Sequence, residues 1–114
     1  MKKSFAIGVD LGGTNLRVAL VSREGEIIKK LKVPSFEKAE EALISSISEM
    51  FEGAENVAGI GIGVAGLIDR ASSIVVISPN LPSIERVPIA EILTARFNVP
   101  VFIENDANAA ALGE

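Results

Sequence analysis

An aspartate placed just before a glycine-rich turn is the pattern in this sequence best suited to chemistry. Asp10 ends an apolar run, and the next apolar run begins only after a turn that contains Gly12, Gly13, Thr14 and Asn15. Backbone N–H groups freed by paired glycines, with a hydroxyl beside them, can hold phosphate oxygens. A carboxylate at a strand end can hold the magnesium that travels with a nucleotide. The pattern predicts a phosphate loop, and an ordinary hairpin turn explains the same residues equally well.

Four further residues are candidates for binding a polar ligand. Asp106 lies between a predicted strand and a predicted helix, so it is either a helix N-cap or a general base aimed at a hydroxyl. Asn105 beside it either binds a polyol or ends the strand. Asn80 lies between two prolines, where it is either a turn residue or an amide that binds sugar hydroxyls. Gly66 at a strand end could let a ligand approach the backbone.

The elements that must position these residues follow from hydrophobic periodicity and turn signals. The predicted strands span residues 4–11, 16–22, 27–33, 57–65 and 101–104, with a short strand at 74–77. The predicted helices span residues 36–52 and 88–97, and an alanine-rich helix begins at residue 107. Short connections make the first three strands an antiparallel meander.

This order of elements predicts an α/β fold with a five-stranded mixed sheet of order 3-2-1-4-5, flanked by helices. Helical crossovers place the later strands parallel to the first, with right-handed connections. Ligands in such sheets lie beyond the carboxyl ends of the parallel strands. The Asp10 turn, Gly66 and the Asn105–Asp106 pair all follow such ends, so we expect them to meet at one edge of the sheet.

Composition narrows the class of protein. The 114 residues make one domain at most, and 48% are hydrophobic although only 4% are aromatic. The net charge of -4 argues against nucleic acid as a partner. There is no cysteine and no histidine, so thiol catalysis, disulfides and an ordinary zinc site are excluded within this sequence. No segment has the length of a membrane span, and we expect a cytoplasmic protein.

Two other patterns are better explained by structure than by binding. Residues 61–66 match G-x-G-x-x-G, but the glycines fall inside a predicted strand and no helix follows, so dinucleotide binding is disfavoured. Instead, the nearly continuous apolar composition of residues 57–65 suggests burial on both faces, and Gly59, Gly61 and Gly63 suggest close packing by a neighbour. The acidic residues Glu37, Glu40 and Glu41 suit a solvated helix face better than a metal site.

Four blocks taken together resemble the N-terminal lobe of a ROK-family sugar kinase, with glucokinases most similar. The blocks are DLGGTNLRVAL, GIGVAGLID, SPNLP and VFIENDANAAALGE, in that order. The resemblance implies the ribonuclease H-like fold of the actin and hexokinase superfamily, and transfer of the ATP γ-phosphate to a hexose with Mg²⁺. It leaves the identity of the hexose open.

The resemblance also implies roles for individual residues. The phosphate and magnesium loop would comprise Asp10, Gly12, Gly13, Thr14 and Asn15, with Asp10 toward the metal. The sugar contacts would be Gly66, Asn80, Asn105 and Asp106. Asp106 would be the base that takes the proton from the attacking hydroxyl.

Residues 1–114 would then form the substrate-side lobe of a two-lobe kinase. The C-terminal nucleotide lobe and the Cys/His zinc motif of the family lie outside this sequence. We therefore expect the isolated chain to be inactive and to expose apolar surface through which it could form a homo-oligomer. The alternative is the sugar-sensing domain of a ROK-type repressor; only three residues precede the first strand, which favours the kinase.

Overall fold

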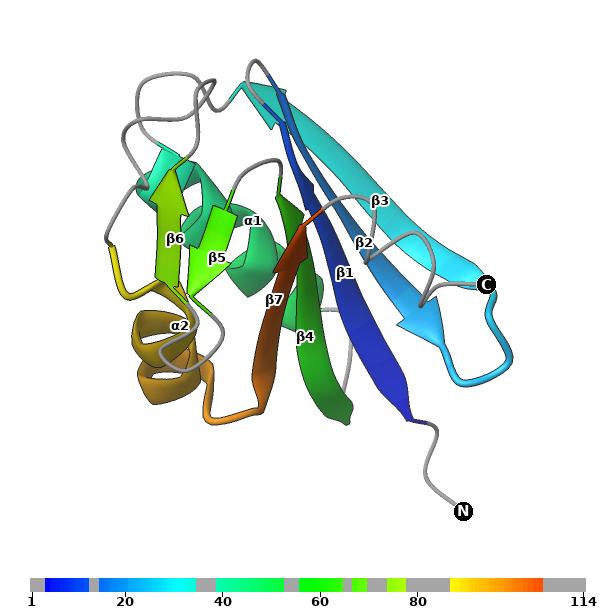
Figure 1. Cartoon of the computed structure of the whole chain (residues 1–114). Coiled ribbons are helices and arrows are strands. Elements are labelled where there is room, and N and C mark those ends of the chain that lie inside the picture. Colours follow the sequence, from blue (N-terminus) through cyan, green and yellow to red (C-terminus); the bar gives the residue numbers. More distant parts are fainter. Residues whose placement is uncertain are drawn as a thin grey trace.

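The computed structural model describes residues 4–12, 15–34, 39–52, 56–64, 67–69, 74–77 and 87–105. Along the chain the strands are β1 (Phe5–Leu11), β2 (Asn15–Ser22), β3 (Ile27–Pro34), β4 (Val57–Val64), β5 (Leu67–Asp69), β6 (Ile74–Ile77) and β7 (Val101–Asn105). The helices are α1 (Ala39–Glu52) and α2 (Ile89–Phe97). Figure 1 shows α1 behind the main sheet and α2 beside β7.

The main sheet has the predicted order. Its five strands run β3-β2-β1-β4-β7, so β7 is the fifth strand expected from the sequence. The first three strands form an antiparallel meander, and β4 and β7 are parallel to β1. The prediction of a five-stranded mixed α/β sheet flanked by helices is therefore confirmed (Figure 1).

The β2–β3 turn shows why the meander closes where the sequence indicates. Gly25 has φ of 89°, a left-handed conformation that a side chain would strain. The Gly25 N–H donates to the Ser22 carbonyl at 2.9 Å, and the Glu26 N–H donates to Ser22 Oγ at 3.1 Å. The turn at residues 23–26, between two predicted strands, is thus held by one glycine and one serine.

Both helices lie on the same face of the sheet. The residues of α1 that recur at helical spacing (Ala39, Leu43, Ile47 and Met50) are all buried, as predicted. Helix α1 begins at Ala39; the expected start at residue 36 lies outside the described residues. The rings of Phe51 at the end of α1 and Phe97 at the end of α2 stack with centroids 4.9 Å apart, which joins the two helices.

Helix α2 begins and ends at residues suited to those positions. Pro88 immediately precedes the helix, where its missing N–H costs nothing. Asn98 adopts the left-handed conformation after the last turn, and its N–H donates to the Thr94 carbonyl at 2.8 Å. The predicted span of 88–97 therefore agrees with the structure to one residue.

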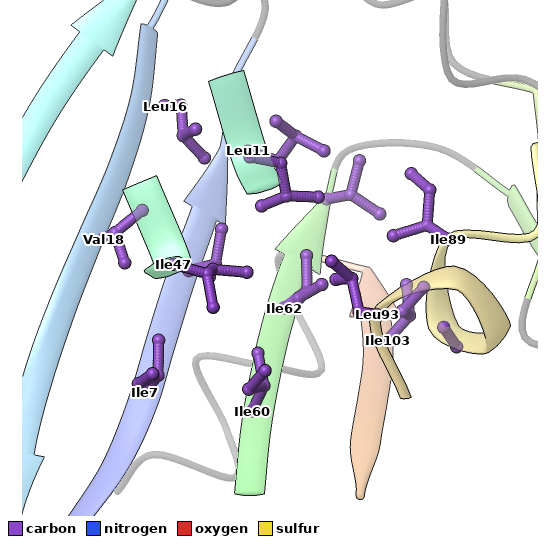
Figure 2. Packing of buried hydrophobic residues seen from close by; sticks show 14 of the residues in the cluster. Ile7, Leu11, Leu16, Val18, Ile47, Ile60, Ile62, Ile89, Leu93 and Ile103 are labelled. Atoms are coloured by element: carbon purple, nitrogen blue, oxygen red, sulfur yellow. The ribbon is translucent and has the colours of Figure 1, made fainter. Parts of the chain in front are cut away.

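The hydrophobic core lies between the helices and the sheet, and Figure 2 shows side chains from four strands converging on it. Alternate residues of each strand point into this layer, which is the pattern of a sheet with one covered face. The strand residues that it buries are Ile7, Val9, Leu11, Leu16, Val18, Leu20, Ile60, Ile62, Val64 and Ile103. Nearly all are aliphatic, as the low aromatic content of the sequence predicts.

The face of the sheet that points away from the core is built mainly from small and charged residues. We call it the second face and define it by Ala6, Gly8, Asp10, Arg17, Ala19, Lys30, Lys32, Gly61 and Phe102. All of these residues are exposed except Ala19, which is half-buried.

The prediction that residues 57–65 are buried on both faces is wrong at Gly61, which is exposed. Within the part of the chain that the structure describes, a Cβ added at Gly8 or Gly61 would meet nothing within 4 Å. Close packing over the glycines does occur at Gly59, where a Cβ would lie 3.3 Å from the Pro100 carbonyl oxygen. A glycine counts as apolar in the composition of a strand, but it has no side chain that must be buried. The apolar composition of β4 therefore overstated its burial.

A separate two-stranded sheet follows β4. The short strand predicted at 74–77 is present as β6, and it pairs antiparallel with β5, which the sequence did not predict. β5 has only three residues, too short for an alternation pattern to be recognised. The predicted helix from residue 107 and the acidic residue Glu37 lie outside the described residues.

Truncation of one core residue of α1 tests this packing. Leu43 is fully buried, so Leu43→Ala should lower the free energy of unfolding by about 2–5 kcal/mol, since it leaves a cavity between α1 and the sheet. Urea denaturation followed by circular dichroism measures the change. Ile27→Ala is the matched control because Ile27 is 57% exposed, and its effect should stay within about 0.5 kcal/mol. Equal effects of the two variants would contradict the described core.

Candidate functional site at the carboxyl ends of the parallel strands

The carboxyl ends of the three parallel strands lie in one row. Leu11 of β1 is in register with Val64 of β4, and Val64 is in register with Asn105 of β7. The segments that follow these residues therefore leave the sheet at a common edge. The predicted meeting of the three strand ends is confirmed for the strands themselves (Figure 1).

Gly12, which follows β1, lies close to the first residue of β2. The Gly12 N–H donates to the Asn15 carbonyl at 3.0 Å, which closes the hairpin between β1 and β2. A Cβ on Gly12 would lie 3.0 Å from that same oxygen, a distance that real Cβ atoms rarely show. Asn15 is the first residue of β2, and Gly13 and Thr14 lie outside the described residues.

Asp10 lies one residue before the end of β1, on the second face. Its carboxylate Oδ2 lies 3.7 Å from Nη1 of Arg17, and the two side chains are 57% and 61% exposed, respectively. Water therefore screens the pair, and its contribution to stability is small. The Asp10 carboxylate remains accessible to a ligand arriving from solvent.

The Asp10 carboxylate suits a metal ion that is coordinated mainly by water and by phosphate oxygens of a substrate. Among the described residues no three His, Cys, Asp or Glu side chains gather as a metal site. A single accessible carboxylate beside a glycine turn suits Mg²⁺, which commonly takes one or two protein carboxylates and completes its shell with water and substrate phosphates.

Arg17 was not among the residues predicted for the site. The register of β1 and β2 places it directly opposite Asp10, and Lys32 of β3 lies opposite Arg17 in the same row. The alternation of β2 could have indicated this, because Leu16 and Val18 are core residues and Arg17 between them must point the other way. Its pairing with Asp10 depends on the exact hairpin register.

The residues predicted for sugar binding are placed only in part. Asn105 is the last residue of β7, as expected for a group at the sheet edge. Gly66, Asn80 and Asp106 lie outside the described residues. Asp106 directly follows β7 in the sequence, and Gly66 comes two residues after the end of β4.

No helix among the residues that the structure describes is long and apolar enough to cross a membrane.

Comparison with known proteins assigns nearly the whole sequence to one family. The profile of the ROK family matches residues 6–114. The chain is 44% identical to a glucokinase of Thermotoga maritima, an alignment that covers 100% of this chain and 37% of that protein. It is 35% identical to a xylose repressor of Caldicellulosiruptor bescii, over 95% of this chain and 29% of the repressor.

Solved structures agree with the sequence comparison. A ROK family glucokinase from Streptomyces griseus, crystallised in complex with glucose and AMPPNP, superposes with a TM-score of 0.82 at 35% identity. The match covers 94% of this chain and 35% of that structure. The chain thus spans little more than a third of the length of the kinases it matches. Because the family profile extends over nearly the whole sequence and the fold agrees, this chain belongs to the ROK family.

Proposed function

We propose that this chain is the substrate-side lobe of an ATP-dependent hexose kinase. One observation carries the proposal: Asp10 and Asn105 lie at the carboxyl ends of two parallel strands, and these ends are in register at one edge of the sheet. Only β4 separates β1 from β7, so their axes lie about 10 Å apart at the usual strand spacing. That spacing allows a phosphate group and a sugar hydroxyl to be held next to each other.

On the phosphate side, the proposed loop is Asp10, Gly12, Gly13, Thr14 and Asn15. The hydrogen bond from the Gly12 N–H to the Asn15 carbonyl supports this role because it joins the two residues that flank the proposed loop. Bound with ATP, Mg²⁺ would offset charge on the phosphates, and the Asp10 carboxylate is the group that would hold it. The nucleotide in the Streptomyces griseus complex supports ATP as the phosphate donor.

On the sugar side, the proposed contacts are Gly66, Asn80, Asn105 and Asp106. Asp106 is the proposed general base: its carboxylate takes the proton of the attacking hydroxyl as that oxygen bonds to the γ-phosphorus and the bond to ADP breaks. Phosphoryl transfer depends mainly on positioning, so a carboxylate that directly follows a strand in the sequence suits the task. The glucose in the Streptomyces griseus complex supports a hexose as acceptor.

The second candidate is a sugar-sensing domain of a ROK-type repressor, without catalysis. The 35% identity to a xylose repressor is the observation that favours it. The kinase is preferred because the identity to a glucokinase is higher, at 44%, and because the sequence carries Gly12, Gly13 and Thr14 after Asp10. The proposal includes a cytoplasmic location, where ATP is available, with no nucleic-acid or membrane partner.

Substitution of Asp106 tests the kinase. In the full-length gene product that contains this sequence, Asp106→Asn should lower kcat by about 10²–10⁴-fold with a smaller change in KM, because the base is lost while the hydrogen-bonding shape remains. A coupled ADP-release assay over glucose, mannose, fructose, N-acetylglucosamine and N-acetylmannosamine measures both constants. Glu91→Gln, which changes an exposed acid on α2, is the matched control.

Unchanged turnover in Asp106→Asn would mean that Asp106 acts only as a helix cap. Sugar binding without turnover in the unmodified protein would favour the repressor.

The isolated chain should not phosphorylate sugar at a useful rate. It would retain the proposed base and phosphate loop, but it lacks the part of the protein that would grip the nucleotide and close over the substrate. The assay combines residues 1–114 with ATP, Mg²⁺ and glucose beside the full-length protein at equal concentration. Turnover comparable to that of the full-length protein would contradict the proposal.

The isolated chain should also self-associate through its second face. Phe102 is 66% exposed there, and a hollow of about 550 Å³ lined by Gly8, Gly61 and Phe102 lies beside it. We propose that a second copy of the chain covers Phe102 and the hollow beside it. Sedimentation at increasing concentration should show oligomers, and Phe102→Lys should shift them toward monomer. Ile27→Lys, at the β2–β3 turn, is the control because Ile27 is exposed away from this hollow. A monomer at every concentration would refute the proposal.

A further inference from the structure

The carboxylate of Asp10 lies in a locally positive environment on a chain whose net charge is -4. A hollow of about 690 Å³ on the second face is lined by Asp10 and by three cations, Arg17, Lys30 and Lys32, together with small and apolar residues. The described charges around this hollow therefore sum to a positive value. Lys30 and Lys32 come from one basic stretch of β3, and the pairing of β1, β2 and β3 brings them and Arg17 to the same face as Asp10.

Strand register explains why these charges gather. Asp10, Arg17 and Lys32 occupy one row across β1, β2 and β3, so their side chains point to the same side of the sheet. Arg17 stands between the carboxylate and the lysine. Repulsion by Lys32 and attraction by Asp10 both favour the observed contact of Nη1 with Oδ2 at 3.7 Å.

The pair has opposite consequences for two kinds of ligand. A free divalent cation that approaches Asp10 is attracted by one negative charge and repelled by the guanidinium beside it. A complex of one divalent cation with ATP has a net negative charge, so its phosphates are attracted by Arg17 while its metal is attracted by Asp10. At about 4 Å in water one unit charge changes such an affinity by about fivefold.

We infer that Arg17 is a specificity-determining residue: it makes the Asp10 turn prefer a divalent cation already bound to a nucleoside triphosphate over the free cation. The inference rests on the proposed function. The contact of Arg17 with Oδ2 leaves Oδ1 as the oxygen that can reach the metal, so both interactions can exist together. Since both side chains are more than half exposed, the effect is on ligand selection and adds little to folding stability.

The test measures two affinities in the full-length gene product, with Mn²⁺ as the probe. Electron paramagnetic resonance of free Mn²⁺ gives the Kd of the metal alone and, with AMPPNP present, the Kd of the metal–nucleotide complex. Arg17→Met removes the charge and keeps the length of the side chain. It should weaken binding of the complex about fivefold and tighten binding of Mn²⁺ alone by a similar factor.

Three further variants separate this role from a structural one. Arg17→Lys keeps the charge and should restore both affinities to within about twofold of the unmodified protein. Lys32→Met removes a charge from the same row, one strand farther from Asp10, and should change both affinities less than Arg17→Met does. Asp10→Asn should weaken binding of both the metal and the complex.

The outcomes distinguish the two proposals. Opposite shifts of the two affinities in Arg17→Met support the inference, because general damage to the fold would weaken both. Shifts in the same direction, or none, overturn the inference and leave the kinase proposal standing. Absence of Mn²⁺–AMPPNP binding in the unmodified protein overturns the phosphate side of the kinase proposal and this inference with it.

Discussion

The parallel ladder of β1, β4 and β7 is the constraint on which the rest of the structure depends. Each of these strands buries alternate aliphatic side chains against the helices, and a slip of one residue would turn that set toward solvent. The cost of such a slip fixes the register that aligns Leu11, Val64 and Asn105. The position of the candidate site is therefore a by-product of hydrophobic burial on the opposite side of the sheet.

One face of the sheet packs the hydrophobic core, and the other face carries the charged residues of the candidate site. One face carries the aliphatic core and receives α1 and α2, whose ends are joined by the stacked rings of Phe51 and Phe97. The second face carries small residues near its middle and charged residues near the Asp10 turn. Since the same strands supply both faces, the packing that stabilises the fold also holds the charges of the site in a fixed row.

Much of the fold could be predicted from the sequence. Alternation in β1 and β2 and the helical recurrence from Ala39 to Met50 follow from local periodicity, and the structure confirms them. The turn at Gly25 follows from the conformational freedom of glycine, and it is also present. β5 was missed because three residues carry no period. The burial of β4 was overestimated, since a glycine in an apolar strand was counted as a hydrophobic residue that must be buried.

The candidate site divides in the same way. The local pattern around Asp10 and Gly12 predicts a phosphate-binding turn, and that role stays a prediction, as do the roles assigned to Gly66, Asn80, Asn105 and Asp106. Arg17 was assigned no role in the sequence analysis. Its position opposite Asp10 depends on the register of the β1–β2 hairpin, which the residues of one strand do not specify.

By itself the sequence determined the five strands of the main sheet, the two helices and their order, because these depend on the spacing of apolar side chains along short stretches. Only the tertiary structure decided that Asp10, Arg17 and Lys32 share a row and that Gly61 is exposed. Those outcomes depend on distances between strands, and such distances exist only once the hydrophobic core has fixed how the strands pair.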